Sequence, residues 1–199
     1  FTDSPPKHLK FASAGGMALQ TAVEERWQEI TGKPVVQGYG LTETSPALTF
    51  EPLGKKRSGT IGVPVPSTLV ACLDDDGHEV PVGQSGEIAA KGPQIMAGYW
   101  NKPEETAAVM KDGWFLTGDI GVMDADGYFT IVDRKKDMVV VSGFNVYPNE
   151  NEECLATHPA IVEAAVIGVP DDATGEAVKA FIVRRDPSLS EADIRTHCK

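Results

Sequence analysis

The sequence predicts the end of a large α/β domain with a β-rich subdomain, followed by a small α+β domain. Residues 9–40 read as strand, helix and strand, which is the pattern of a βαβ unit with parallel strands. Residues 58–133 alternate short apolar runs with Asp-Gly turns, which is typical of antiparallel β structure. A charged run, DRKKD, then precedes a strand, a helix and two further strands. These three observations predict the fold class.

The first element expected is a strand within 9–19 that ends in a Gly-Gly turn. A helix follows to about Gly32, because apolar residues recur at i, i+4 and i+7: Val23, Trp27 and Ile30. Gly32 and the proline after it stop this helix, and residues 34–40 form a buried strand. We expect the parallel sheet to continue before Phe1.

The β-rich region is expected to contain strands near 68–74, 86–92, 121–124 and 128–133, and one helix with Pro103 in its first turn. The last part is expected to contain a strand at 138–143, a helix from about Pro148 to Thr157 and strands at 161–171 and 177–186. We therefore predict these domains: 1–133 as the C-terminal part of the large domain, with 58–133 as its subdomain; 134–136 as a hinge; and 137–199 as a truncated small domain.

The composition excludes several classes of partner. The formal net charge of −11 argues against nucleic acid and against anionic membrane surfaces. No apolar run approaches the ~20 residues of a membrane span. The odd number and wide spacing of the cysteines indicate reduced thiols in a cytosolic protein, without disulfide or metal-ligand spacing: Cys72, Cys154 and Cys198. The four histidines also form no ligand cluster in the sequence.

The stretch GYGLTET, residues 38–44, is the first candidate site. A glycine-rich turn after a strand brings backbone N–H groups close to an anion, although neither the Walker nor the dinucleotide spacing is present. Tyr39 offers a flat face to a base, and Thr42 and Thr44 offer hydroxyl groups to phosphate oxygens. Glu43 offers a carboxylate of the kind that holds Mg²⁺. Together these side chains predict a nucleotide site.

A second candidate lies in residues 112–136. The TGD sequence places Asp119 after a glycine at a strand edge, where a carboxylate can accept both hydroxyls of a ribose. From this tripeptide alone, an aspartate in an ordinary turn is the favoured interpretation. Arg134 lies just past the next strand, where a guanidinium can reach ribose or phosphate.

Four long motifs resemble the adenylate-forming superfamily of acyl-CoA synthetases, luciferases and peptide-synthetase adenylation domains. They are residues 38–46, 86–106, 112–148 and 158–171, in the family's order and across nearly the whole chain. Within the superfamily, residues 112–136 are similar to the signature segment of fatty acyl-CoA synthetases, and the chain resembles bacterial long-chain fatty-acid–CoA ligases most. The resemblance implies an acid–thiol ligase of lipid metabolism that uses ATP, CoA, a fatty acid and Mg²⁺. It forms an acyl-adenylate and then an acyl-CoA.

The resemblance also implies roles for individual residues. Tyr39 stacks on adenine, Thr42 contacts the α-phosphate and Glu43 holds Mg²⁺, so Thr42 and Glu43 are the expected catalytic residues. Asp119 binds the ribose hydroxyls, and Arg134 supports the ribose. The other nucleotide-binding neighbours implied are Gly15, Gly16, Gln37 and Gly38.

Two further residues match the family's moving parts. Lys136 matches the hinge about which the small domain turns between the adenylating and the thioester-forming arrangement. A solvated, charged segment suits a bending point because it buries nothing when the backbone turns. Taken alone, DRKKD would be read as an ordinary charged surface run. Gly143 matches the segment that approaches CoA.

Two elements of the family are absent from these 199 residues: the glycine-rich phosphate loop and the catalytic lysine. We expect them before Phe1 and after Lys199, and we expect this chain alone not to be fully active. Asn151 also departs from the family, which usually has an apolar residue there. A buried, unpaired amide would cost about 1–3 kcal/mol, so the site is more exposed or the helix is weakened.

Three hypotheses follow from the sequence. The first is part of a fatty acyl-CoA ligase, in the cytoplasm with peripheral membrane contact left open. The second is an aryl- or amino-acid-activating relative, because most of the acyl pocket is expected outside the chain. The third is a non-catalytic nucleotide-binding remnant. A glycine-rich loop before the chain and a Gly-Lys segment after it would exclude the third. The sequence does not indicate the oligomeric state or the acyl chain length.

Overall fold

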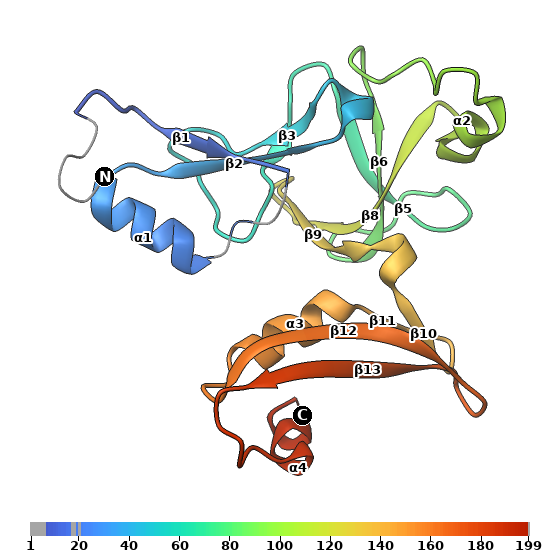
Figure 1. The fold of residues 1–199 in the computed structure, drawn as a ribbon. Helices are drawn as coiled ribbons and strands as arrows, with labels where there is room; N and C mark the ends of the chain where they lie inside the picture. Colours follow the sequence, from blue (N-terminus) through green and yellow to red (C-terminus); the bar gives the residue numbers. More distant parts are fainter. Residues whose placement is uncertain (1–6, 17–18, 20, 199) are drawn as a thin grey trace. The chain divides into compact units, whose positions relative to one another are not determined.

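A computed structural model describes residues 7–16, 19 and 21–198 of the chain (Figure 1). The chain divides into two compact units, residues 1–131 and 132–199.

The first sheet of unit 1 has the strand order β1-β2-β3-β4. The helix α1 (Thr21–Thr31) connects β1 (Ala12–Ala14) to β2 (Val35–Gly40), and these two strands are parallel, so the predicted βαβ unit is confirmed. The strands β3 (Ala47–Phe50) and β4 (Val63–Pro64) pair antiparallel and were not predicted.

The helix α1 lies beside β1 and β2 (Figure 1) and ends where predicted, at a glycine with φ of +64°. Its apolar face is only partly covered. Trp27 and Ile30 are half-buried, whereas Val23 is 53% exposed. The 3.6-residue period therefore predicted the helix correctly, but not the burial of its first apolar residue.

The second sheet of unit 1 is antiparallel, as predicted, along β5-β6-β8-β7. Its strands are β5 (Leu69–Leu73), β6 (Ser85–Lys91), β7 (Met110–Lys111) and β8 (Trp114–Met123), and β9 (Phe129–Arg134) also pairs with β8. The predicted helix is α2 (Pro103–Val109), with its proline in the first turn. Glycines 77 and 127 close the Asp-Gly turns with φ near +88° and +80°, a conformation that glycine adopts at little cost.

One hydrophobic cluster joins the two sheets of unit 1. Tyr39 and Leu48 come from the first sheet, and Ile88 and Ala90 come from the second. Full burial of an aliphatic side chain of this size contributes about 1.5–3 kcal/mol, so the cluster fixes one sheet against the other. It also fixes β2, whose last three residues are Gly38, Tyr39 and Gly40, so the glycine-rich turn expected here is in fact the end of a strand.

Unit 2 is a four-stranded antiparallel sheet with the order β11-β10-β13-β12. Its elements are β10 (Val139–Val141), β11 (Phe144–Val146), α3 (Pro148–Ala156), β12 (Ile161–Asp171), β13 (Gly175–Arg184) and α4 (Glu191–His197). The predicted strand, helix, strand, strand order is present. The hairpin β10–β11 was not predicted. In the structure, Ser142 and Gly143 both have positive φ, as a two-residue hairpin turn of this kind requires.

The core of unit 2 lies between its helices and the sheet, where Leu155, Ile161, Val166 and Leu189 are buried. Asn151 in α3 is half-buried, and its Nδ2 donates to the carbonyl oxygen of Tyr147 at 3.0 Å. The amide is therefore paired within its own helix. The penalty considered for an unpaired amide does not apply.

The division between the units falls between Ile131 and Val132, inside β9. The expected hinge begins at the last residue of β9 and continues into the short 3₁₀ helix η2 (Lys135–Asp137), where Lys136 is exposed. The carboxylate of Asp133, only 3% exposed, accepts hydrogen bonds from the backbone N–H of Arg134 and from the backbone and side-chain N–H groups of Asn149. It therefore fastens the end of β9 to the first turn of α3.

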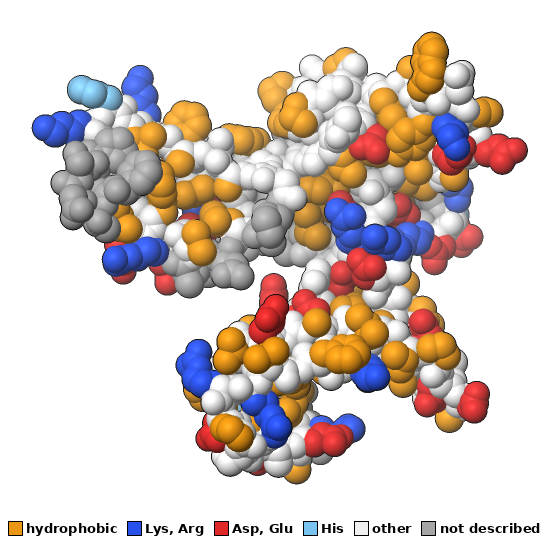
Figure 2. All heavy atoms as spheres, viewed as in Figure 1, with side chains coloured by type: hydrophobic (Ala, Val, Ile, Leu, Met, Phe, Trp, Pro, Cys, Tyr) orange, Lys and Arg blue, Asp and Glu red, His pale blue; other side chains and the backbone are white. Residues whose placement is uncertain are grey.

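Charged side chains of both signs are spread over the face of the molecule seen in Figure 2. The largest exposed hydrophobic side chain of the described residues is Trp100, which is 89% exposed. Among the described residues, no helix combines the length and the apolar character needed to cross a membrane.

Candidate nucleotide site

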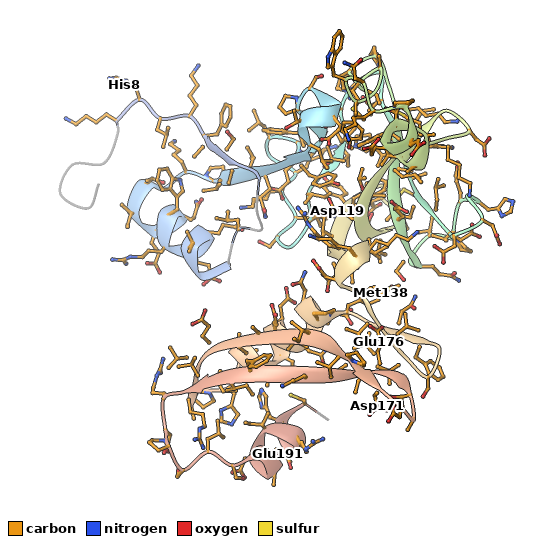
Figure 3. All side chains as sticks on the ribbon, turned by 45° about the vertical axis from the view of Figure 1, so that its right-hand side comes forward. His8, Asp119, Met138, Asp171, Glu176 and Glu191 are labelled. Carbon is orange, nitrogen blue, oxygen red and sulfur yellow. The ribbon has the colours of Figure 1, made fainter. Side chains whose placement is uncertain are left out.

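Three short segments of unit 1 form the candidate site: the turn after β1, the end of β2 with the 3₁₀ turn η1 (Thr42–Thr44), and the middle of β8. The last of these carries Asp119, which is labelled in Figure 3. The turn after β1 and the end of β2 lie at the carboxyl ends of neighbouring parallel strands. Ligands of open α/β sheets bind at such ends.

Glycines allow the backbones of these segments to approach closely. A Cβ on Gly15 would lie 2.8 Å from the carbonyl oxygen of Gly38, and a Cβ on Gly40 would lie 1.7 Å from that of Pro46. A Cβ on Gly38 would lie 2.7 Å from the ring of Phe50. Gly16 adopts a φ of +89°. The structure therefore brings Gly15 and Gly38 together, and their contact with a nucleotide stays a prediction.

Tyr39 and Asp119 meet although they are 80 residues apart in the sequence. The hydroxyl of Tyr39 donates to Oδ2 of Asp119 at 2.7 Å, and the two residues are 9% and 7% exposed. Sequence reasoning treated them as separate contacts to base and ribose and did not predict the bond. The bond ties the GYG strand to β8 and sets the orientation of the carboxylate.

The backbone around Asp119 is held by its own neighbours. The N–H of Gly118 donates to Oε1 of the buried Glu87 at 3.0 Å, and the N–H of Asp119 donates to the hydroxyl of Thr117 at 3.2 Å. That hydroxyl donates in turn to the carbonyl oxygen of Ile88 at 2.8 Å. Gly118 has φ of +76°, and the pairing of β8 with β6 is irregular between Leu116 and Ile120, so β8 bulges at TGD instead of turning.

The two threonines of the 3₁₀ turn differ in their exposure to solvent. Thr42 is exposed, as a phosphate contact requires. Thr44 is fully buried, and its hydroxyl oxygen accepts from the N–H of Leu41 at 2.8 Å and lies 2.9 Å from the carbonyl oxygen of Leu41. The expectation that Thr44 offers its hydroxyl to a phosphate is therefore wrong. The hydroxyl closes the turn because the side chain points into the core.

Glu43, the expected Mg²⁺ ligand, is half-buried on the same turn. Its Oε1 accepts from the hydroxyl of Tyr99 at 2.9 Å, and its carbonyl oxygen accepts from the N–H of Met96 at 2.8 Å. The bond to Glu43, together with partial burial, raises the pKa of Tyr99 above its ordinary value. Tyr99 was not predicted as a site residue, although its GYW sequence is part of a motif that carries the resemblance.

Gln37, an expected nucleotide neighbour, is buried within β2. Its N–H donates to Oε2 of Glu51 at 2.7 Å, and its carbonyl oxygen accepts from the N–H of Glu51 at 2.9 Å. Oε1 of Glu51 also accepts from the N–H of Arg57 at 3.2 Å. The fully buried Glu51 is thus bonded to main-chain groups on both sides, and it fixes the strand that carries the site.

The structure places Arg134, Lys136 and Gly143 in unit 2. Arg134 and Lys136 are exposed, and Gly143 has φ of +83° with no atom within 4 Å of an added Cβ. Their relation to Tyr39 and Asp119 stays a prediction.

Groups that looked isolated in the sequence come together elsewhere. The rings of His158 and His197 pack edge to face with centroids 4.9 Å apart, and the thiol of Cys154 donates to the carbonyl oxygen of His197 at 3.9 Å. Among the described residues, one group has the geometry to hold a metal ion: Asp74, Asp76 and His78, all exposed. It lies in the turn after β5 and does not include Glu43, so it is separate from the candidate site.

Comparisons with known proteins show the family and the fold of the chain. Residues 2–100 match the model of the AMP-binding enzyme family, and residues 150–199 match the model of the AMP-binding enzyme C-terminal domain. A long-chain-fatty-acid–CoA ligase of Yersinia pestis is 54% identical over 100% of this chain and 36% of its own length. A feruloyl-CoA synthase of an Amycolatopsis species is 41% identical over 93% of the chain and 38% of its own length.

A solved structure with the same fold is ATP-bound MatB from Rhodopseudomonas palustris. It has a TM-score of 0.86 and 38% identity over 94% of this chain and 38% of that protein. The chain thus spans little more than a third of the length of the proteins it matches. The two family models cover most of the chain in the family's order, and the chain belongs to the AMP-binding, adenylate-forming enzyme superfamily.

Proposed function

We propose that the chain is part of an ATP-dependent fatty acyl-CoA ligase. The ligase joins a fatty acid to ATP to form an acyl-adenylate and pyrophosphate. CoA then displaces AMP to give acyl-CoA. The observation that carries the proposal is the bond from Tyr39 to Asp119 beside the Thr42-Glu43 turn, in a chain of the AMP-binding family.

The residues of unit 1 fit the nucleotide part of this reaction. The ring of Tyr39 is held between the two sheets, so it is fixed before a base stacks on it. Asp119 accepts one bond from Tyr39 through Oδ2, and a carboxylate has further lone pairs for the two ribose hydroxyls. The exposed hydroxyl of Thr42 is available to an α-phosphate oxygen.

Adenylation builds negative charge on the α-phosphoryl group, and preorganised donors aimed at that charge contribute most to the rate. We propose that Thr42 supplies one such donor. The attacking carboxylate of the fatty acid needs no general base, because it is already ionised. Arg134 and the hinge at Lys136 would act from unit 2, and Gly143 would allow CoA to approach its backbone.

The donor set at the turn fits Mg²⁺. Magnesium keeps several waters and is held in nucleotide enzymes by one or two carboxylates together with substrate phosphates. Glu43 supplies one half-buried carboxylate, and Thr42 lies beside it on the same turn. When bound, the ion would neutralise phosphate charge as a Lewis acid.

A second candidate is an aryl-CoA ligase. The 41% identity to a feruloyl-CoA synthase supports it, whereas the higher identity to a long-chain-fatty-acid–CoA ligase favours the fatty acid. Both share the nucleotide residues above, so these residues do not separate the two candidates.

The test is a thioester assay on the full-length polypeptide that contains this sequence. ATP, CoA and Mg²⁺ are supplied with palmitate, octanoate, coumarate or an amino-acid mixture. We expect palmitate to be preferred and the variant Asp119→Ala to lose most of the activity. The 199-residue chain alone is expected not to reach the turnover of the full-length protein.

Each other result would redirect the proposal. Activity on coumarate alone would favour the aryl-CoA ligase. Nucleotide binding without product from any acid would favour a binding protein. Full activity of Asp119→Ala would remove the ribose role.

A further inference from the structure

The segment between β6 and α2, residues 92–102, is tied to the 3₁₀ turn that carries Glu43. The N–H of Met96 donates to the backbone carbonyl of Glu43 at 2.8 Å, and the hydroxyl of Tyr99 donates to its carboxylate at 2.9 Å. Nε2 of Gln94 donates to the carbonyl oxygen of Ala47 at 3.2 Å, just past the turn. Two bonds therefore hold this segment against the turn, and the third holds it against the start of β3.

We propose that Tyr99 is a positioning residue that holds the Glu43 carboxylate in the orientation that binds a divalent cation. This inference rests on the proposed function, since it concerns the same site. It adds a residue that carries no chemistry itself and acts through Glu43.

Tyr99 is suited to this role because its own backbone is fixed. Its N–H donates to the hydroxyl of Thr106 at 2.9 Å, and that hydroxyl donates to the carbonyl oxygen of Lys102 at 2.7 Å. The N–H of Lys102 donates back to the carbonyl oxygen of Tyr99 at 3.2 Å. The start of α2 thus anchors the tyrosine, although its side chain is 36% exposed.

Glu43 needs such a partner because its turn is short. The 3₁₀ helix has three residues, and a half-exposed glutamate on it would otherwise sample several rotamers. One phenol donor occupies one lone pair of Oε1, and a carboxylate offers about four acceptor sites in all. The carboxylate can therefore accept from Tyr99 and bind a cation at the same time. Partners of this kind change metal affinity about 10–100-fold when they are removed.

The experiment measures cation binding directly, apart from turnover. Mn²⁺ is titrated into the full-length protein with the non-hydrolysable analogue α,β-methylene-ATP, and free Mn²⁺ is followed by electron paramagnetic resonance. The variants are Tyr99→Phe, Glu43→Gln and, as a matched control, Tyr128→Phe. The control removes a phenol that donates to the carbonyl oxygen of Lys55 at 2.7 Å, outside the site.

We expect Tyr99→Phe to weaken Mn²⁺ binding about 10-fold or more and Tyr128→Phe to leave it unchanged. In turnover assays, Tyr99→Phe should raise the Mg²⁺ concentration needed for half-maximal rate, and the rate should recover at saturating Mg²⁺. Thr106→Val, which removes the anchor of the Tyr99 N–H, should weaken Mn²⁺ binding in the same direction. It gives a second test if Tyr99→Phe folds poorly.

One result would overturn the role of Tyr99 and leave the proposed function standing. In it, Tyr99→Phe and Thr106→Val both bind Mn²⁺ within 2-fold of wild type, while Glu43→Gln binds it less well. Unchanged Mn²⁺ binding in Glu43→Gln would overturn the metal role of Glu43 and, with it, this inference. Equal weakening in Tyr99→Phe and Tyr128→Phe would also overturn it, because the effect would then be general.

Discussion

The bond between Tyr39 and Asp119 allows a quantitative test of how the site is held. Replacing Tyr39 by Phe removes one hydroxyl and keeps the ring in its cluster with Leu48, Ile88 and Ala90. The lost bond is buried, is 2.7 Å long and ends on a carboxylate. Hydrogen bonds to charged groups contribute about 1.5–3 kcal/mol, so we expect the free energy of unfolding to fall by that amount.

Urea unfolding followed by tryptophan fluorescence is the assay. All three tryptophans lie in unit 1, so the signal reports on the unit that contains the bond: Trp27, Trp100 and Trp114. With a denaturant slope of about 1–3 kcal/mol per M, a loss near 2 kcal/mol lowers the midpoint by roughly 1 M. The double variant Tyr39→Phe/Asp119→Asn should then cost less than the sum of the two single changes.

Tyr128→Phe is the matched control. It also removes a phenol bond of 2.7 Å, but its acceptor is the neutral backbone carbonyl of Lys55. A bond between neutral groups contributes about 0.5–1.5 kcal/mol, so the control should be the milder change. If Tyr39→Phe costs no more than Tyr128→Phe, and its coupling to Asp119→Asn is below about 0.5 kcal/mol, the reasoning is refuted.

Three further predictions follow from local geometry. Gly40→Ala should destabilise unit 1 by about 4 kcal/mol or more in urea unfolding, because the new Cβ would lie 1.7 Å from the backbone oxygen of Pro46. A loss under about 1 kcal/mol would contradict this prediction, because the backbone near Pro46 would then move away at little cost. Burial raises the pKa of the Cys72 thiol from 9.0 to about 11. The stability that the neutral buried thiol contributes is therefore complete below pH 9 and is lost as the pH rises toward 11. Thermal melts of Cys72→Ala should lack this pH dependence. Asn149→Ala should destabilise the start of α3 by about 1–3 kcal/mol because the buried Asp133 loses a side-chain donor, and normal amide-exchange protection in α3 would contradict this.

The sequence predicted elements whose cause is local. The period of Trp27 and Ile30 indicated α1, and the proline and glycines at element ends indicated where helices and turns stop. It predicted only the end of β8, and it missed β3, β4, β7 and β11, which are strands of two to four residues. Strands this short carry too few residues to show a period, and neighbouring strands stabilise them. Tertiary contacts also decide the burial of Val23. Its position fits the helical period, but its exposure depends on what packs against the helix.

The sequence by itself determined the residue types and the family resemblance of the site: the GYG sequence, Thr42, Glu43 and Asp119. Only the tertiary structure decided how they are used. It turned Thr44 inward and left Thr42 exposed, although both belong to one turn. It also paired side chains that are 80 and 56 residues apart, Tyr39 with Asp119 and Glu43 with Tyr99. Residue chemistry and period are local properties of the chain, whereas these bonds exist because core packing sets two sheets and a loop against one another.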